Sequence, residues 1–127
     1  MSKTVLEILA GDLAKNYPDE PQDAESYLHK VTASVEQGLV RLYRKFDTLF
    51  IVHGNEWHSI HSGSGAELLA ACLAFLQQLK DEGMTHMFTH YDNPKVSLIA
   101  EHSSTFKATV TQTDEGKYRT FKLSVEL

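Results

Sequence analysis

The sequence predicts an α+β domain: a mixed, mostly antiparallel sheet with one central parallel β–α–β pair and helices on both faces. Three observations support this fold class. The apolar period changes along the chain from 3.6, typical of helices, to 2, typical of strands. A strand, a glycine turn, a helix and a second strand follow one another near the middle of the chain, and two alternating segments close it as a hairpin. With 127 residues, the chain is expected to form one domain, 1–127.

The central unit begins with a strand, Glu56–His61, and a turn of alternating serine and glycine, 62–65. A helix over Ala66–Glu82 follows, and then a strand over Met84–Tyr91. The helix is indicated by an apolar face at helical spacing, made of Leu68, Leu69, Cys72, Phe75, Leu76 and Leu79. A crossover of this length makes the two strands parallel neighbours, so the glycine turn lies at the carboxyl end of one strand and the amino end of the helix. Backbone N–H groups and the helix dipole favour an anion there.

The flanking segments complete the order α, α, β, β, β, α, β, α, β, β. Two helices, Thr4–Lys15 and Gln22–Gln37, and two strands, Leu39–Lys45 and Leu49–His53, are expected before the central unit. Leu49–His53 is a continuous apolar run, which is typical of a strand covered on both faces. A short helix, Pro94–His102, is expected after the unit. In the closing hairpin one apolar side is formed by Phe106, Ala108, Val110, Phe121, Leu123 and Val125.

Composition narrows the function classes. The chain is 42% hydrophobic and 23% charged with a formal charge of −5, and it has neither a basic run nor a basic helix face. We therefore expect no nucleic-acid and no membrane partner. The lone cysteine, Cys72, lies on an apolar helix face, which indicates a buried thiol in a reducing compartment. No signal pattern is recognised in the first residues, so a cytoplasmic location is expected.

Histidines are numerous, with seven in the chain, and four of them fall on strands predicted to be adjacent: His58, His61, His86 and His90. No H-E-x-x-H or cysteine–histidine spacing accompanies them, so no metal site is predicted.

From its paired early helices to its last strand, this order resembles the GCN5-related N-acetyltransferase (GNAT) fold. The resemblance implies that the turn binds the pyrophosphate of acetyl-CoA through four residues, Gly63, Ser64, Gly65 and Ala66. It also implies that Met84–Tyr91 is splayed from Glu56–His61 to admit the acetyl group. Asn93 matches the asparagine that leads a short helix beside the thiol arm of the cofactor.

Acetyl transfer to an amine needs a base for the ammonium and donors for the oxyanion. On the strand before the turn, Glu56 and His58 alternate to one face and are candidate bases, and His61 is a candidate on the other face. Tyr91 is the candidate acid for the leaving thiolate, with Ser97 or solvent as alternatives. The resemblance thus implies acetyl-CoA as co-substrate and a small-molecule or protein amine as acceptor.

Three departures from the family pattern support a second hypothesis. Ile60 stands where the family has arginine or glutamine, Ala100 stands where it often has the tyrosine acid, and Glu67 places a carboxylate in the first helical turn. The carboxyl half is also similar to small acetyltransferase-like proteins of tailed phages, some of them internal virion proteins. The alternative is therefore a catalytically inactive acetyltransferase-like protein used for binding or structure. Its partner would be a second copy, a phage particle or a host protein.

Overall fold

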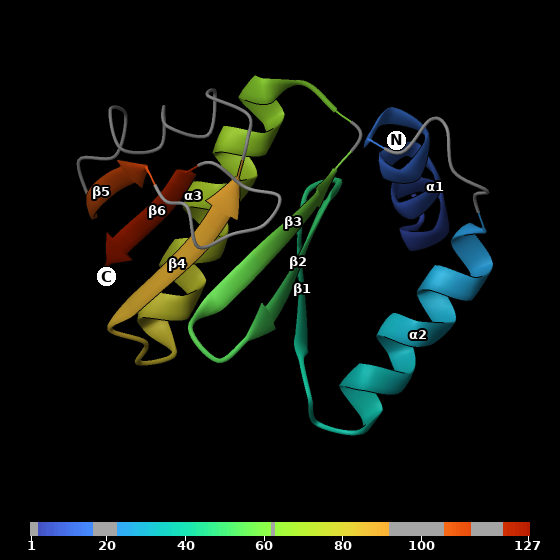
Figure 1. Ribbon diagram of the computed structural model, residues 1–127, viewed down its shortest axis with the longest axis horizontal. Helices are drawn as coiled ribbons and strands as arrows, with labels where there is room; N and C mark the ends of the chain where they lie inside the picture. Colours follow the sequence, from blue (N-terminus) through green and yellow to red (C-terminus); the bar gives the residue numbers. More distant parts are fainter. Residues whose placement is uncertain (1–2, 17–22, 62, 92–105, 113–120) are drawn as a thin grey trace.

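A computed structural model of the chain describes residues 3–16, 23–61, 63–91, 106–112 and 121–127. Over these residues the elements follow one another as α1 (Val5–Asn16), α2 (Ala24–Glu36), β1 (Arg41–Lys45), β2 (Thr48–His53), β3 (Glu56–His61), α3 (Gly65–Asp81), β4 (His86–Tyr91), β5 (Lys107–Gln112) and β6 (Phe121–Glu126). The described strands form one sheet in the order β1-β2-β3-β4-β6-β5 (Figure 1). The α+β fold class is confirmed. The expected helix at 94–102 and Asn93 lie outside the described residues.

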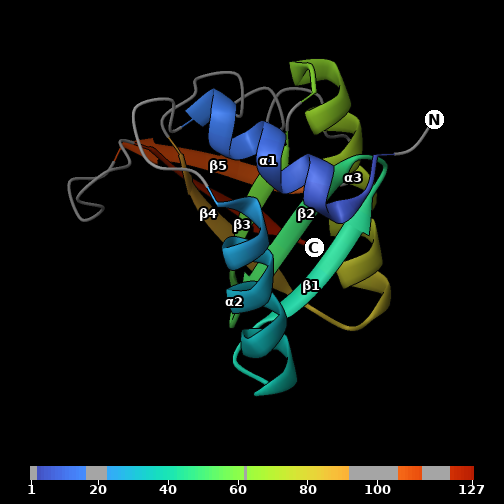
Figure 2. The ribbon, with the colours of Figure 1, turned by 90° about the vertical axis from the view of Figure 1, so that its right-hand side faces the viewer.

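All neighbouring strands in the sheet pair antiparallel except β3 and β4, which are parallel. Helix α3 connects these two strands and packs on one face of the sheet, whereas α1 and α2 pack on the other face over its β1–β3 half (Figure 2). The predicted β–α–β unit and the helices on both faces are therefore present.

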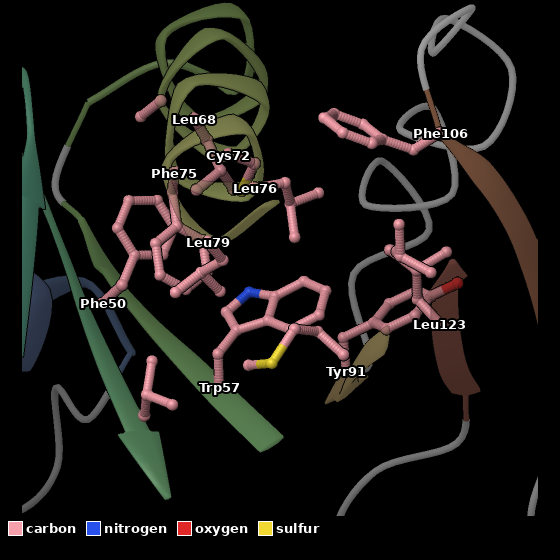
Figure 3. Packing of buried hydrophobic residues seen from close by; sticks show 14 residues of the cluster. Phe50, Trp57, Leu68, Cys72, Phe75, Leu76, Leu79, Tyr91, Phe106 and Leu123 are labelled. Atoms are coloured by element: carbon pink, nitrogen blue, oxygen red, sulfur yellow. The ribbon is translucent and has the colours of Figure 1, made fainter. Parts of the chain in front are cut away.

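The larger core lies between α3 and the sheet (Figure 3). Phe75 is at its centre: its ring stacks on Phe50 with centroids 4.2 Å apart, and it meets Tyr43 edge-on at 5.5 Å and Trp57 at 6.0 Å. The predicted apolar face of the helix supplies this core, and Leu69, which is half-buried, packs against it. Cys72 is buried within it, and burial raises the pKa of its thiol to about 12. The Cys72 thiol is therefore unreactive at neutral pH, in agreement with the buried thiol expected from the sequence.

The smaller core lies under α1, where Ile8 and Leu9 pack with Leu49 of β2 and Ile60 of β3. Since Phe50 and Val52 of β2 belong to the larger core, side chains of β2 are buried on both faces. The apolar run that indicated a doubly covered strand is thereby confirmed.

Strand β3 has the predicted bounds, and several other elements begin or end one or two residues from the predicted position, for local reasons. Helix α2 begins at Ala24 instead of Gln22 because Asp23 is its N-cap, accepting a 3.0 Å hydrogen bond from the N–H of Ser26. Strand β4 begins at His86 instead of Met84 because the N–H of Met84 donates to the carbonyl of Leu79, which ends α3. No helix in the described part of the chain is long and apolar enough to cross a membrane.

Candidate functional site

The parallel strands β3 and β4 are joined at one end only. Their register contains a single residue pair, Glu56 with Phe88, whereas β2 and β3 pair along their whole length. Two bonds from the turn before β3 hold the start of β4: Phe88 N–H donates to the Asn55 carbonyl at 2.8 Å, and the Asn55 amide donates to the His86 carbonyl at 2.9 Å. Beyond this point backbone pairing stops.

One residue further along, the two strands are joined by a side-chain hydrogen bond instead of a backbone hydrogen bond. The hydroxyl of Thr89 donates a 2.7 Å hydrogen bond to the carbonyl oxygen of Trp57, and both residues are buried. The peptide groups of the two strands are therefore bridged by a side chain where parallel pairing would be direct.

On the face of the sheet opposite α3, this junction carries a carboxylate between two imidazoles. Glu56 Oε2 lies 3.1 Å from Nδ1 of His90, and Glu56 Oε1 lies 3.2 Å from Nε2 of His58. Glu56 and His90 are about three-quarters buried, whereas His58 is half exposed. A carboxylate bonded to Nδ1 of His90 fixes the orientation of that ring and leaves Nε2 as the nitrogen that can accept a proton.

The same face continues onto β6. The ring of Phe88 meets that of His90 edge-on at 5.7 Å, and the Lys122 ammonium lies 4.6 Å from the Phe88 ring centroid. His90 and Lys122 are direct cross-strand partners. Acid–base groups and an aromatic ring are thus gathered on one sheet face.

Tyr91 lies on the other face. Its side chain is buried in the larger core and stacks on Phe121, with centroids 5.6 Å apart. The structure therefore brings Glu56 and His58 together, as the alternation predicted, but it does not bring Tyr91 to them.

The turn before α3 is occupied by the chain's own groups. Ser64 is the N-cap of α3 and accepts a 3.3 Å hydrogen bond from the N–H of Glu67. The Glu67 carboxylate folds back over Gly63, so that a Cβ built on Gly63 would overlap it. From α1, the Lys15 ammonium lies 3.4 Å from the Gly63 carbonyl oxygen. Gly65 and Ala66, in the first turn of α3, are exposed.

His61 ends β3 beside this turn. Its Nδ1 is buried and has no hydrogen-bond partner among the described residues. Burial lowers the pKa of its imidazole, the charge of Lys15 lowers it further, and the Glu67 carboxylate opposes both.

Two residues that the sequence did not assign to the site belong to it by position. His90 was predicted to lie on a strand adjacent to that of His58, but its contact with Glu56 depends on the register between β3 and β4. Lys15 comes from a helix at the start of the chain, and no spacing in the sequence links it to Gly63. Among the described residues, no group of three or more histidine, cysteine or acidic side chains is arranged to hold a metal ion.

A groove on another part of the surface lies away from these residues. A groove of about 200 Å³ between α2 and the first two strands is lined by Tyr27, Lys30, Val31, Ser34, Val40 and Ile51. None of the predicted site residues borders it.

The comparisons with known proteins add no relative: no family model, no curated protein and no solved structure matches this chain.

Proposed function

We propose that the protein is an acetyl-CoA-dependent N-acetyltransferase of the GNAT type. The observation that carries this proposal is the parallel pair β3–β4, which is paired at Glu56 and Phe88 alone and is followed at once by the capped amino end of α3. A strand pair open beyond its first residue leaves backbone groups for an extended thiol arm. The helix terminus beyond it favours the phosphates.

In this proposal the amides of Gly63, Ser64, Gly65 and Ala66 bind the pyrophosphate, and the Lys15 ammonium adds a positive charge beside them. Asn93, which lies outside the described residues, is the residue that the family resemblance assigns to the thiol arm. Bound acetyl-CoA supplies an acyl group activated as a thioester.

The proton of the acceptor ammonium passes to the pair formed by Glu56 and His90, with His58 as the second imidazole on the same carboxylate. The leaving thiolate takes its proton from solvent, because Tyr91 is buried in the larger core on the other face of the sheet. The acceptor class is a primary amine on a small molecule or a protein.

Two observations favour the alternative, a catalytically inactive acetyltransferase-like protein with a binding or structural role in a phage particle or on a host protein. The Glu67 carboxylate covers Gly63, where a phosphate would lie. On the α3 face, Trp57 and Tyr91 lie near each other in the larger core (Figure 3), and Met87 belongs to the same buried cluster.

Calorimetric titration with acetyl-CoA, and with free CoA alongside, tests the proposal. We expect micromolar binding of both, and loss of binding in Gly63→Glu, which adds a second carboxylate at the turn. Ala70→Glu is the matched control, since it adds the same charge at an exposed position of α3. Equal binding by the Gly63→Glu variant and the wild type would exclude the turn as the pyrophosphate site.

Catalysis is then tested by release of free thiol from acetyl-CoA in the presence of a panel of primary amines. The assay is clean because the protein's cysteine is buried. We expect Glu56→Gln to lower the transfer rate by about 10²- to 10⁴-fold with unchanged acetyl-CoA affinity. Binding without transfer to any amine would favour the inactive alternative.

A further inference from the structure

Lys122 occupies an unusual position for a lysine of a solvent-facing sheet surface. Its ammonium lies over the Phe88 ring, 4.6 Å from the centroid, and its side chain is half-buried. Within the described part of the chain, no carboxylate lies within ion-pair distance of it. The Lys122 ammonium is therefore held by the aromatic ring of Phe88 through a cation–π contact.

The imidazole of His90 can act as a base, and it lies on the strand next to Lys122. His90 is the cross-strand partner of Lys122, and directly opposed residues on one face have Cβ atoms about 4.5–5.5 Å apart. Nδ1 of His90 is bound to Glu56 at 3.1 Å, and the His90 ring contacts Phe88. Lys122 and His90 are thus neighbours in register on β6 and β4, both contact the Phe88 ring, and His90 in turn contacts Glu56 on β3.

Another lysine on the same sheet face lacks these neighbours. Lys107 lies on β5 and is exposed, and its cross-strand partner is Glu126. Accessibility alone would make Lys107 the more reactive of the two amines. Local base catalysis would reverse that order.

We propose that Lys122 is an acyl-acceptor site of this protein, acetylated on its ε-amine by acetyl thioesters with His90 as the base. The ε-ammonium gives one proton to Nε2 of His90, and the free amine attacks the thioester carbonyl carbon. The C–N bond forms and the C–S bond breaks. The thiolate leaves and takes up the second proton lost by the nitrogen, and His90 returns its proton to water.

This inference shares the thioester chemistry of the proposed function and adds the chain's own lysine as a substrate. It does not depend on the turn before α3. A truncated thioester, S-acetyl-N-acetylcysteamine, lacks the pyrophosphate and therefore separates the two. Acetylation of Lys122 by this reagent without any binding of acetyl-CoA would leave the inference standing and remove the proposed cofactor site.

The experiment incubates the purified full chain with the truncated thioester and follows acetylation of each lysine by peptide mass spectrometry. We expect Lys122 to react at least about 10-fold faster than Lys107. The His90→Gln variant, with its fold checked by circular dichroism, is expected to be acetylated at Lys122 about 10²-fold or more slowly than the wild type. Its rate of acetylation at Lys107 is expected to be unchanged. Lys122→Arg keeps the cation over Phe88 and confirms the assignment of the modified peptide.

Glu56 acts through His90 and is a positioning residue in this step. The Glu56→Gln variant keeps the His90 imidazole and replaces His90→Gln as the test variant if that one does not fold. We expect Glu56→Gln to lower the rate of Lys122 acetylation as well. The double variant, which carries both Glu56→Gln and His90→Gln, is expected to react no more slowly than His90→Gln alone, because the two residues act as one unit. Acetylation of Lys122 no faster than that of Lys107, or equally fast in both single variants, overturns the proposal.

Discussion

Thr89 joins the two parallel strands through its side chain: its hydroxyl donates a 2.7 Å hydrogen bond to the carbonyl oxygen of Trp57. Threonine is 6% exposed here and Trp57 is 1% exposed, so the bond is shielded from water. It lies one residue beyond the single backbone pair of β3 and β4. The strand pair is therefore closed at its start by backbone bonds and held at a fixed spacing by a side chain.

Replacing Thr89 by valine is expected to lower the free energy of unfolding by about 1–3 kcal/mol. Valine keeps the shape of threonine but leaves the buried Trp57 carbonyl without its donor. Urea denaturation measures the change. Thr109→Val, at an exposed position of β5, is the control and is expected to change stability by no more than about 0.5 kcal/mol. Equal stability of the two variants would show that water replaces the lost bond.

Replacing Glu67 by glutamine is expected to tighten acetyl-CoA binding by about 2- to 5-fold. The carboxylate lies in the first turn of α3 and over Gly63, where it competes with a phosphate for the helix terminus. Glutamine keeps the length of the side chain without the charge. Titration calorimetry compares the variant with Glu25→Gln, which removes the first-turn carboxylate of α2. Weaker binding by the Glu67 variant would show that the carboxylate belongs to the binding site instead of blocking it.

Stability is expected to fall in mildly acidic solution because of His61. Burial, aided by Lys15, holds the pKa of its imidazole below the usual value of 6.5. Between that value and the lower native pKa, the unfolded chain binds more protons than the native chain. The free energy of unfolding therefore decreases as the pH falls through 6.5 towards the native pKa, and levels off below it.

The measurement is urea denaturation at about pH 7.5 and about pH 5.5, on either side of the usual histidine pKa. His61→Gln is expected to reduce the difference in stability between the two conditions. His53→Gln, at the exposed end of β2, controls for the loss of a histidine elsewhere. An identical pH dependence in His61→Gln and the wild type would contradict the assignment.

The order of the elements could be predicted because each one has a local signal. Helix α3 has its apolar stripe and the serine cap at Ser64, and β2 has its doubly apolar run. Alternation also placed Glu56 and His58 on one face of β3, and the structure has them together there. Such signals act within one element, so they predict which face a side chain takes.

Contacts between elements could not be predicted from local signals of this kind. The contact of Glu56 with His90 depends on the register of a parallel pair whose members are separated by a whole helix. Lys15 reaches Gly63 only because α1 packs under the end of β3. Packing in three dimensions sets both contacts, and neither leaves a spacing in the sequence.

Phe75 offers the sharpest test of the core that supports the site. Its ring contacts Phe50, Tyr43 and Trp57, and Trp57 in turn accepts the bond from Thr89.

Phe75→Ala is expected to lower the free energy of unfolding by about 3–5 kcal/mol, because the cavity is surrounded by rings that cannot collapse into it. Leu73→Ala, at a half-buried position of the same helix, is the control and is expected to cost less. Chemical denaturation measures both variants. A loss below about 1 kcal/mol for Phe75→Ala, on the scale of an ordinary point substitution, would mean that the aromatic cluster is not the centre of the fold.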